Sequence, residues 1–238
     1  MIIEPHYILP GEDGIKGALL DAYLAAGYYR MQHLIFTTNQ TQLDIEDEPL
    51  PVFWLRSPVK NIVDNKAATV IRKRCAPFSV AIKKAVITKE INELYSLYHA
   101  HINFTASPTC AGYLHQQDIE NPYDSWMVEV RDNDTLIALG FFDRGKNAIT
   151  GILNFYHPAY NKYSLGKYLI LLKIDFALAS DIPFYYTGYI STVIAKFDYN
   201  LFPDAAAIEV YLPVERQWVP YYLLGKPLLQ AYYNHHFG

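Results

Sequence analysis

The sequence contains little cysteine and no long apolar run that is free of charge. Only two of the 238 residues are cysteine, Cys75 and Cys110, which excludes a disulfide framework and favours a reducing compartment such as the cytoplasm. The most apolar run, residues 168–178, is interrupted by Lys173 and Asp175, so it is too short and too charged to span a membrane. The N-terminus lacks a basic stretch followed by an apolar one, and we expect no signal peptide.

The net charge is only −4, but the basic residues are unevenly distributed. Residues 56–89 hold nine Lys and Arg against one acid, Asp64, whereas the rest of the chain holds 11 basic and 23 acidic residues. Such a segment binds polyanions or forms a solvated basic face, and no nucleic-acid motif decides between the two readings. With 51% apolar residues the chain is expected to be globular, and its length allows one large domain or two small ones.

Residue patterns in the first third predict a small region of mixed secondary structure. Apolar residues at helical spacing predict a helix over 14–26, which Gly27 would end. The proline-containing acidic stretch 39–51 predicts a loop. Apolar and β-favouring residues predict strands at 28–38, 52–55 and 78–86.

The middle of the chain changes from helix to an antiparallel meander. Thr88 predicts the N-cap of a helix, and residues 103–124 form a long irregular stretch that is either a functional loop or a mobile insert. Ser164 is expected to cap a second helix, because its hydroxyl can accept a first-turn N–H, and a strand should begin at Phe184. Tight polar connections separate three strands between the two helices, at 126–131, 136–143 and 148–156.

This order of elements predicts the fold class. Three antiparallel strands, a helix and a further strand form the core of acetyltransferase-like (GNAT) domains, in which the helix start faces the acyl carrier. We therefore expect an α+β fold with a GNAT-like, acyl-CoA N-acyltransferase-like mixed sheet flanked by helices. Residues 1–86 would form a smaller α+β N-terminal region, and residues 87–238 the GNAT-like transferase domain. A short helix at 192–196, a strand at 208–212 and a partly helical tail at 223–236 would complete it.

Several short motifs in this domain resemble the C-terminal domain of arginyl-tRNA–protein transferases and their bacterial leucyl-transferring relatives. That family has a strand that ends Phe-Tyr-Asp-Pro, a Ser-Leu-Gly that opens a helix, and a Tyr-Leu-Gly-Tyr strand followed by Lys, Tyr and Lys. The matching residues here are Asp143, Phe155-Tyr156-His157-Pro158, Ser164-Leu165-Gly166, Tyr186-Thr187-Gly188-Tyr189, Lys196 and Tyr199. About 50 residues, roughly 140–200, carry the specific part of the resemblance, on the criterion that a motif counts only in its expected structural context.

The sequence departs from the family at three points. His157 replaces the motif's Asp, Asn200 replaces its second Lys, and the family's N-terminal cysteine cluster is missing. Cys75 and Cys110 lack ligand spacing, and soft-metal sites usually need three or four thiolate or imidazole ligands. We therefore expect no metal and no cofactor.

The resemblance implies aminoacyl transfer of the N-degron type, from an aminoacyl-tRNA carrying Arg or Leu to the N-terminal amine of an acceptor protein. Such a site must orient the amine, remove its proton and stabilise an oxyanion. The catalytic candidates are Asp143, Tyr156, His157, Ser164, Gly166, Tyr189 and Lys196. The candidates for tRNA phosphate contacts are Arg72, Lys73, Arg74, Lys83 and Lys84.

Each candidate also has a purely structural reading. Ser164 is then an ordinary cap, Asp143 a turn residue, His157 a loop residue and Lys196 a surface lysine. With 21 tyrosines in the chain, a single Tyr is more often core than site. Two other functions stay open: an acyl-CoA N-acyltransferase, whose glycine-rich pyrophosphate loop is missing before Gly166, and a non-catalytic relative that binds tRNA or peptide N-termini.

Overall fold

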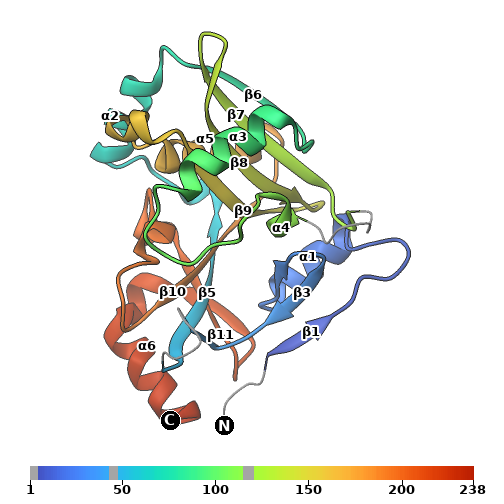
Figure 1. Ribbon diagram of the computed structural model, residues 1–238. Coiled ribbons are helices and arrows are strands. Elements are labelled where there is room, and N and C mark those ends of the chain that lie inside the picture. The colour runs from blue at the N-terminus through green and yellow to red at the C-terminus, as the bar shows by residue number, and fades with distance from the viewer. Residues whose placement is uncertain (1–4, 43–47, 115–120) are drawn as a thin grey trace.

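The computed structural model describes residues 5–42, 48–114 and 121–238 (Figure 1). Its α-helices are α1 (Gly17–Ala25), α2 (Lys66–Cys75), α3 (Lys89–His99), α4 (Ala111–Leu114), α5 (Leu165–Ala179) and α6 (Tyr221–Phe237). Short 3-10 helices are η1 (Val59–Asn61), η2 (Pro158–Tyr163), η3 (Asp198–Leu201) and η4 (Ala205–Ala207).

The strands fall into two sheets. They are β1 (His6–Ile8), β2 (Tyr29–Met31), β3 (Leu34–Thr37), β4 (Gln40–Thr41), β5 (Leu50–Pro58), β6 (Ser79–Lys84), β7 (Ser125–Asp132), β8 (Thr135–Arg144), β9 (Ala148–Tyr156), β10 (Phe184–Ser191), β11 (Glu209–Leu212) and β12 (Gln217–Pro220). In the described residues the small sheet has the order β1-β3-β2, and the large one β12-β11-β5-β10-β9-β8-β7-β6, with β4 added on β5.

The large sheet confirms the predicted fold class. Strands β7, β8 and β9 form the expected antiparallel meander, α5 follows, and β10 returns parallel to β9, so the sheet is mixed. The connection from β9 through α5 to a parallel neighbouring strand is the crossover that such pairing requires. The order of meander, helix and strand is the GNAT-like order that the sequence predicts.

The parallel pairing between β9 and β10 is short. It runs from Ala148 opposite Phe184 only to Thr150 opposite Tyr186. A bulge between Tyr185 and Gly188 then shifts the register of β10 against β5, while β9 continues alongside β8. Because each strand keeps a different neighbour, their C-terminal halves diverge, and α5 begins beside the end of β9.

Helices cover both faces of the large sheet (Figure 1). Helices α5 and α2 pack on one face, where Leu165, Leu169 and Ile174 join a core with Val128, Ala138 and Ile149. Helices α3 and α4 pack on the opposite face, against Leu139, Phe141 and Phe155. Each fully buried aliphatic or Phe side chain stabilises the fold by about 1.5–3 kcal/mol, so the two layers hold the sheet rigid between them.

The predicted helix caps have different outcomes. Thr88 accepts the N–H of Ile91 and caps α3, as predicted. Asn65 caps α2 in the same way through the N–H of Ala68. The predicted cap by Ser164 is wrong, because its side chain makes no capping hydrogen bond to α5.

Other differences lie in the N-terminal third and near residue 195. The single strand predicted at 28–38 is instead the hairpin β2–β3, since the backbone turns at Gln32 with a φ of 57°. The helix predicted at 192–196 is wrong, and the 3-10 helix η3 lies just beyond it. The division into residues 1–86 and 87–238 stays a proposal. Strands β5 and β6 of the large sheet lie within residues 1–86, and its other named strands, apart from β4, lie within residues 87–238.

Candidate active site

The start of α5 has an unusual backbone. Ser164 lies in the left-handed region, with φ 56° and ψ 44°, whereas a side chain that caps a helix belongs to a residue with extended backbone. Its carbonyl accepts the N–H groups of Lys167 and Tyr168. The N–H groups of Leu165 and Gly166 have no acceptor among the described residues. Leu165 is fully buried, whereas Gly166 is partly exposed, so the amide of Gly166 is the one left accessible to an anionic or polarised oxygen.

Tyr156 lies directly against this first turn. A Cβ placed on Gly166 would lie 3.6 Å from Cε1 of Tyr156, so the glycine brings the phenol ring close to the helix backbone. On its other side, the ring of Tyr156 lies 5.7 Å from the ring of Tyr98, which projects from α3. Two of the predicted site residues, Gly166 and Tyr156, are therefore in contact.

Further tyrosines line the place where β9 and β10 diverge. Burial, together with the smaller effects of the neighbouring phenols of Tyr156 and Tyr199, raises the pKa of Tyr98 to about 12. Burial also raises the pKa of Tyr185 and of Tyr189 on β10, and the phenol of Tyr199 lies close enough to Tyr185 to add to that shift. Phenols with raised pKa values remain protonated at neutral pH and donate hydrogen bonds.

Sequence reasoning missed Tyr98 and Tyr199 as parts of this cluster. Because the chain holds 21 tyrosines, no single one is distinctive by type, and these two come from α3 and η3, far apart in the sequence. Tyr199 stands in the motif that follows the Tyr186–Tyr189 strand. Its position in this motif is the sequence signal that could have identified Tyr199 as part of the cluster.

Asn200, which stands where the family has its second Lys, has a structural contact here. Its Nδ2 donates to the carbonyl of Tyr189 at 2.8 Å, and the residue is only 4% exposed. Gly188 accommodates it, with a φ of 124° and space in which a Cβ would lie 3.1 Å from Nδ2. This hydrogen bond of Asn200 thus links η3 to β10.

His157 and Lys196 lie at the edges of this region. The N–H of Ala159 donates to Nδ1 of His157 at 3.2 Å, which makes His157 the N-cap of η2. Lys196 is exposed, and its Nζ lies 4.5 Å from the ring centroid of Phe104. Phe104 follows α3 in the chain, so the segment just after α3 contacts Lys196; residues 115–120 of the predicted irregular stretch 103–124 lie outside the described residues.

Asp143 lies away from the other candidates. On the β8–β9 ladder Asp143 is opposite Thr150 and Ala138 is opposite Tyr156, which separates Asp143 from Tyr156 by about 17 Å along the strand. The Asp143 side chain is fully buried, with its carboxylate 2.7 Å from Nη1 of Arg30. Ser125 donates its hydroxyl to the same carboxylate. Both carboxylate oxygens are occupied, and sequence reasoning missed Arg30.

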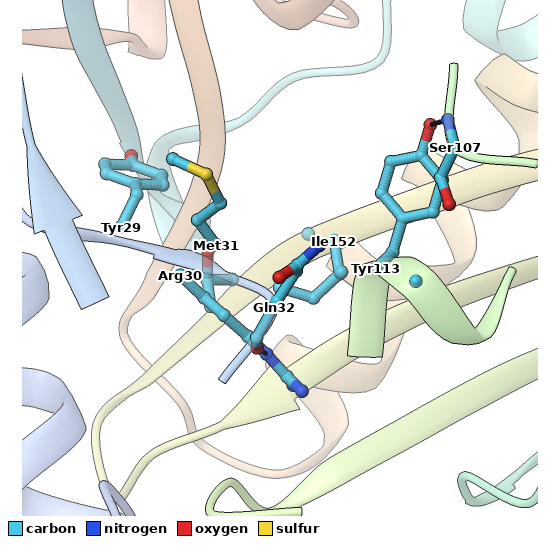
Figure 2. Close-up of a pocket in the computed structure, with 10 residues that line it drawn as sticks. Tyr29, Arg30, Met31, Gln32, Ser107, Tyr113 and Ile152 are labelled. Atoms are coloured by element: carbon cyan, nitrogen blue, oxygen red, sulfur yellow. Dashed lines mark hydrogen bonds between the residues drawn. The ribbon is translucent and has the colours of Figure 1, made fainter. Parts of the chain in front are cut away.

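A cavity of about 250 Å³ lies between the β2 segment, α4 and β9. Figure 2 shows the segment Tyr29–Gln32 facing Ser107 and Tyr113 across it, with Ile152 between them. Tyr113 accepts the N–H of Ser107 through its hydroxyl, at 3.2 Å. The cavity is lined by Tyr29, Arg30, Met31, Gln32, Ser107, Gly112, Tyr113, Thr150, Gly151 and Ile152.

Both polar and apolar side chains line the cavity, and the charged side chain among them, that of Arg30, is already paired. Arg30 uses Nη1 on Asp143 and Ser125, Nη2 on Asn121 and Nε on the carbonyl of Gln32. The buried hydroxyl of Thr150 has no hydrogen-bond partner in the part of the chain that the structure describes. A second cavity of about 500 Å³ shares Arg30 and Met31 with the first and reaches Tyr189 on β10.

The basic candidates lie on α2 and β6. Arg72 binds Asp64 and Asp175, Lys83 binds Glu129, and Lys84 binds Asp124. The other two, Lys73 and Arg74, have no carboxylate partner among the described residues.

The two cysteines lie in different cores. Cys75 packs beneath α5, where burial raises its pKa to about 11, and Cys110 packs in the core of α3. Across residues 5–42, 48–114 and 121–238, no three His, Cys, Asp or Glu side chains form a group that could hold a metal ion. Nor does any helix in those ranges have the length and apolar character to cross a membrane.

Comparison with known proteins shows what this segment is similar to. Residues 90–201 match the profile of the C terminus of arginine-tRNA-protein transferases. An aspartate/glutamate leucyltransferase from Methylobacillus flagellatus is 26% identical over 159 residues, which cover 65% of this chain and 64% of that protein. The protein of the same name from Pseudomonas syringae pv. tomato is 27% identical over 70% of each chain. A third, from Thiobacillus denitrificans, is 35% identical over 28% of each chain.

Solved structures give only remote likenesses. The C-terminal domain of a putative lysylphosphatidylglycerol synthetase from Agrobacterium fabrum has a TM-score of 0.46 at 11% identity, over 60% of this chain and 48% of that one. A GCN5-related N-acetyltransferase from Kribbella flavida has a TM-score of 0.35 at 13% identity, over 72% and 54%. The likeness rests on the sequence matches: residues 90–201 are similar to the C terminus of arginine-tRNA-protein transferases, and the chain is similar to bacterial aspartate/glutamate leucyltransferases.

Proposed function

We propose that this protein transfers an amino acid from an aminoacyl-tRNA to the N-terminal amine of an acceptor protein. The observation that carries the proposal is the start of α5, where the partly exposed Gly166 lies beside Tyr156 and its N–H has no acceptor among the described residues. This turn lies inside the segment that matches the family and next to the divergence of β9 and β10.

The chemistry that we propose there needs no covalent bond between the substrate and the protein. The neutral α-amine of the acceptor attacks the ester carbonyl, the C–N bond forms, and the C–O bond to the ribose of the tRNA breaks. The amine loses a proton and the ribose oxygen gains one, so the step balances without a co-reactant. The accessible backbone amide of Gly166 stabilises the oxyanion that develops on the carbonyl, a type of contact commonly worth 10²–10³-fold in rate.

The other candidates have supporting roles in this proposal. The phenols of Tyr156 and Tyr98 donate hydrogen bonds in the site, because burial and neighbouring phenols keep Tyr98 protonated. Exposed Lys196 attracts an acidic group of the acceptor. Asp143 and His157 act as positioning residues, the first through Arg30 and the second as the cap of η2.

Leucine is the amino acid that we propose is transferred, with Asp or Glu as the first residue of the acceptor. The relatives are named for these residues. We further propose that the protein acts in the cytoplasm, where aminoacyl-tRNAs are made.

Labelled aminoacyl-tRNA provides the test. The purified protein is incubated with Leu-tRNA or Arg-tRNA and with peptides that begin with Asp, Glu, Arg or Lys. We expect label from Leu-tRNA on the Asp and Glu peptides. Absence of transfer from either tRNA to every peptide would refute the proposed activity, and transfer of Arg alone would refute the choice of leucine.

A second candidate is a non-catalytic relative that binds tRNA or peptide N-termini. It is favoured by Asn200, which stands at the position of a family Lys and is committed to the carbonyl of Tyr189. This reading predicts tRNA binding without turnover in the same assay. Binding of acetyl-CoA, measured by titration calorimetry, would instead favour an acyl-CoA transferase.

A further inference from the structure

The basic charge of α2 and β6 is not equally available to a ligand. Arg72 is held by two carboxylates, those of Asp64 and Asp175, with an Nη1–Oδ2 distance of 2.5 Å to Asp175. On β6, Lys83 lies 2.9 Å from Glu129, and Lys84 is bound to Asp124. These cations are already neutralised, so a phosphate that bound them would have to displace a carboxylate.

A second group of cations lies on three elements that touch one another. Lys73 and Arg74 are in the last turn of α2, Lys162 is in η2, and Lys167 is in the first turn of α5. The guanidinium of Arg74 donates to the backbone carbonyl of Lys162, which fastens the end of α2 to η2. Together these four residues form what we call the η2 basic patch.

The η2 basic patch keeps its charge, because none of its members has a carboxylate partner among the described residues. Lys162 Nζ lies 5.2 Å from the ring centroid of Tyr163, and Lys167 Nζ lies 5.2 Å from that of Phe202. The acids on neighbouring segments are engaged elsewhere: Asp64 and Asp175 bind Arg72, and Asp132 accepts the hydroxyl of Tyr160. Lys73, Arg74, Lys162 and Lys167 are all exposed.

We propose that the η2 basic patch binds the phosphates of the acceptor end of tRNA, and that Lys83 and Lys84 of β6 do not. This inference rests on the proposed function and deepens it. Lys167 directly follows Gly166, so RNA bound along α2, η2 and the first turn of α5 places its 3′ end beside the accessible amide of Gly166. Unpaired Lys and Arg release counterions when they bind phosphates, and that release gives RNA binding its affinity and its salt dependence.

Two double variants separate the patch from β6. The first, Lys162→Ala with Lys167→Ala, removes two unpaired cations from the patch. The second, Lys83→Ala with Lys84→Ala, removes the same charge from paired positions and controls for net charge. Both replace exposed side chains, and thermal melts of each variant check that the fold is kept.

Binding of deacylated tRNA is measured by fluorescence anisotropy at several salt concentrations, beside the leucyl-transfer assay. We expect the patch variant to bind about tenfold or more weakly, with the slope of log K against log salt reduced by about two, because each lost phosphate contact removes about one unit of slope. The β6 variant should keep both the wild-type affinity and the wild-type slope.

The outcomes separate the patch from the proposed activity. An unchanged slope in the patch variant, or an equal loss in the β6 variant, would overturn the inference while leaving transfer by the wild type untouched. Wild-type protein that binds tRNA through the patch but transfers nothing would support the inference and refute the activity. If duplex DNA competes as well as tRNA does, the patch is a general polyanion surface and the inference fails.

Discussion

Arg30 and Asp143 form a fully buried ion pair that joins the hairpin β2–β3 to strand β8. Nη1 of Arg30 lies 2.7 Å from one oxygen of Asp143 and 2.9 Å from the other, and neither side chain is exposed. The guanidinium also lies 4.1 Å from the ring centroid of Tyr123. The pair therefore anchors one wall of the 250 Å³ cavity to the large sheet.

Replacement of Asp143 by Ala should destabilise the protein by about 3–5 kcal/mol, because it leaves Arg30 buried without a counter-charge. Urea unfolding followed by circular dichroism measures this, with exposed Lys60→Ala as the control, which should change stability by less than about 0.5 kcal/mol. The double variant Arg30→Met with Asp143→Leu should recover much of the loss. If the single and double variants are equally unstable, the charge pair is not the cause.

Lys173 should make stability depend on pH. The side chain is fully buried on α5, with Nζ bonded to the carbonyl of Phe141 and to Oδ1 of Asn154 at 2.9 and 2.8 Å. Burial lowers its pKa to about 7 from a model-compound value of 10.5. Between those values the unfolded chain binds more protons than the folded one, so stability rises with pH.

Unfolding measured from pH 7 to 9.5 tests this sign. The wild type should gain up to about 1.4 kcal/mol per pH unit relative to Lys173→Met, and the difference should level off below pH 7, where both states are protonated. Lys60→Met supplies the matched exposed control. Parallel pH curves for the wild type and Lys173→Met would show that the amine is charged in the folded protein.

Alanine substitution should change the stability of the protein differently at two helix starts, those at Thr88 and Ser164. Thr88→Ala removes a hydroxyl that accepts the N–H of Ile91 and should cost about 1 kcal/mol. Ser164→Ala removes no capping bond and should cost less than about 0.5 kcal/mol, whereas Ser164→Gly should keep or raise stability because the residue has a φ of 56°. If Ser164→Ala lowered the free energy of unfolding by about 1 kcal/mol, the Ser164 hydroxyl would after all cap α5.

Tyr156→Phe tests the proposed catalytic edge. Loss of the hydroxyl should lower kcat for leucyl transfer by about 10–100-fold, which corresponds to about 1.4–2.7 kcal/mol of transition-state stabilisation. Stability should stay within about 0.5 kcal/mol, because the ring keeps its contacts with Gly166 and Tyr98. Tyr222→Phe, at a position that is 65% exposed, is the control and should leave transfer unchanged.

The local parts of this structure could be predicted from the sequence. The antiparallel meander, α5 and the cap at Thr88 follow from residue periodicity and from backbone preferences that act over a few neighbouring residues. The motif around Gly166 predicted the likeness to the transferases, because its residues lie close together in the chain. Ser164 misled the same reasoning, since residue type alone does not reveal a left-handed backbone.

Only the tertiary structure decided which charges and phenols meet. Arg30 reaches Asp143 across 113 positions, and Lys83 is neutralised by Glu129 from another strand. Tyr98 on helix α3 packs against Tyr156 on strand β9. Such pairs depend on sheet register and helix packing, which arise from the whole chain at once. The sequence by itself determined most of the elements and the likeness to the transferases, and the fold determined which lysines are paired with carboxylates and that the Gly166 amide at the start of α5 is accessible.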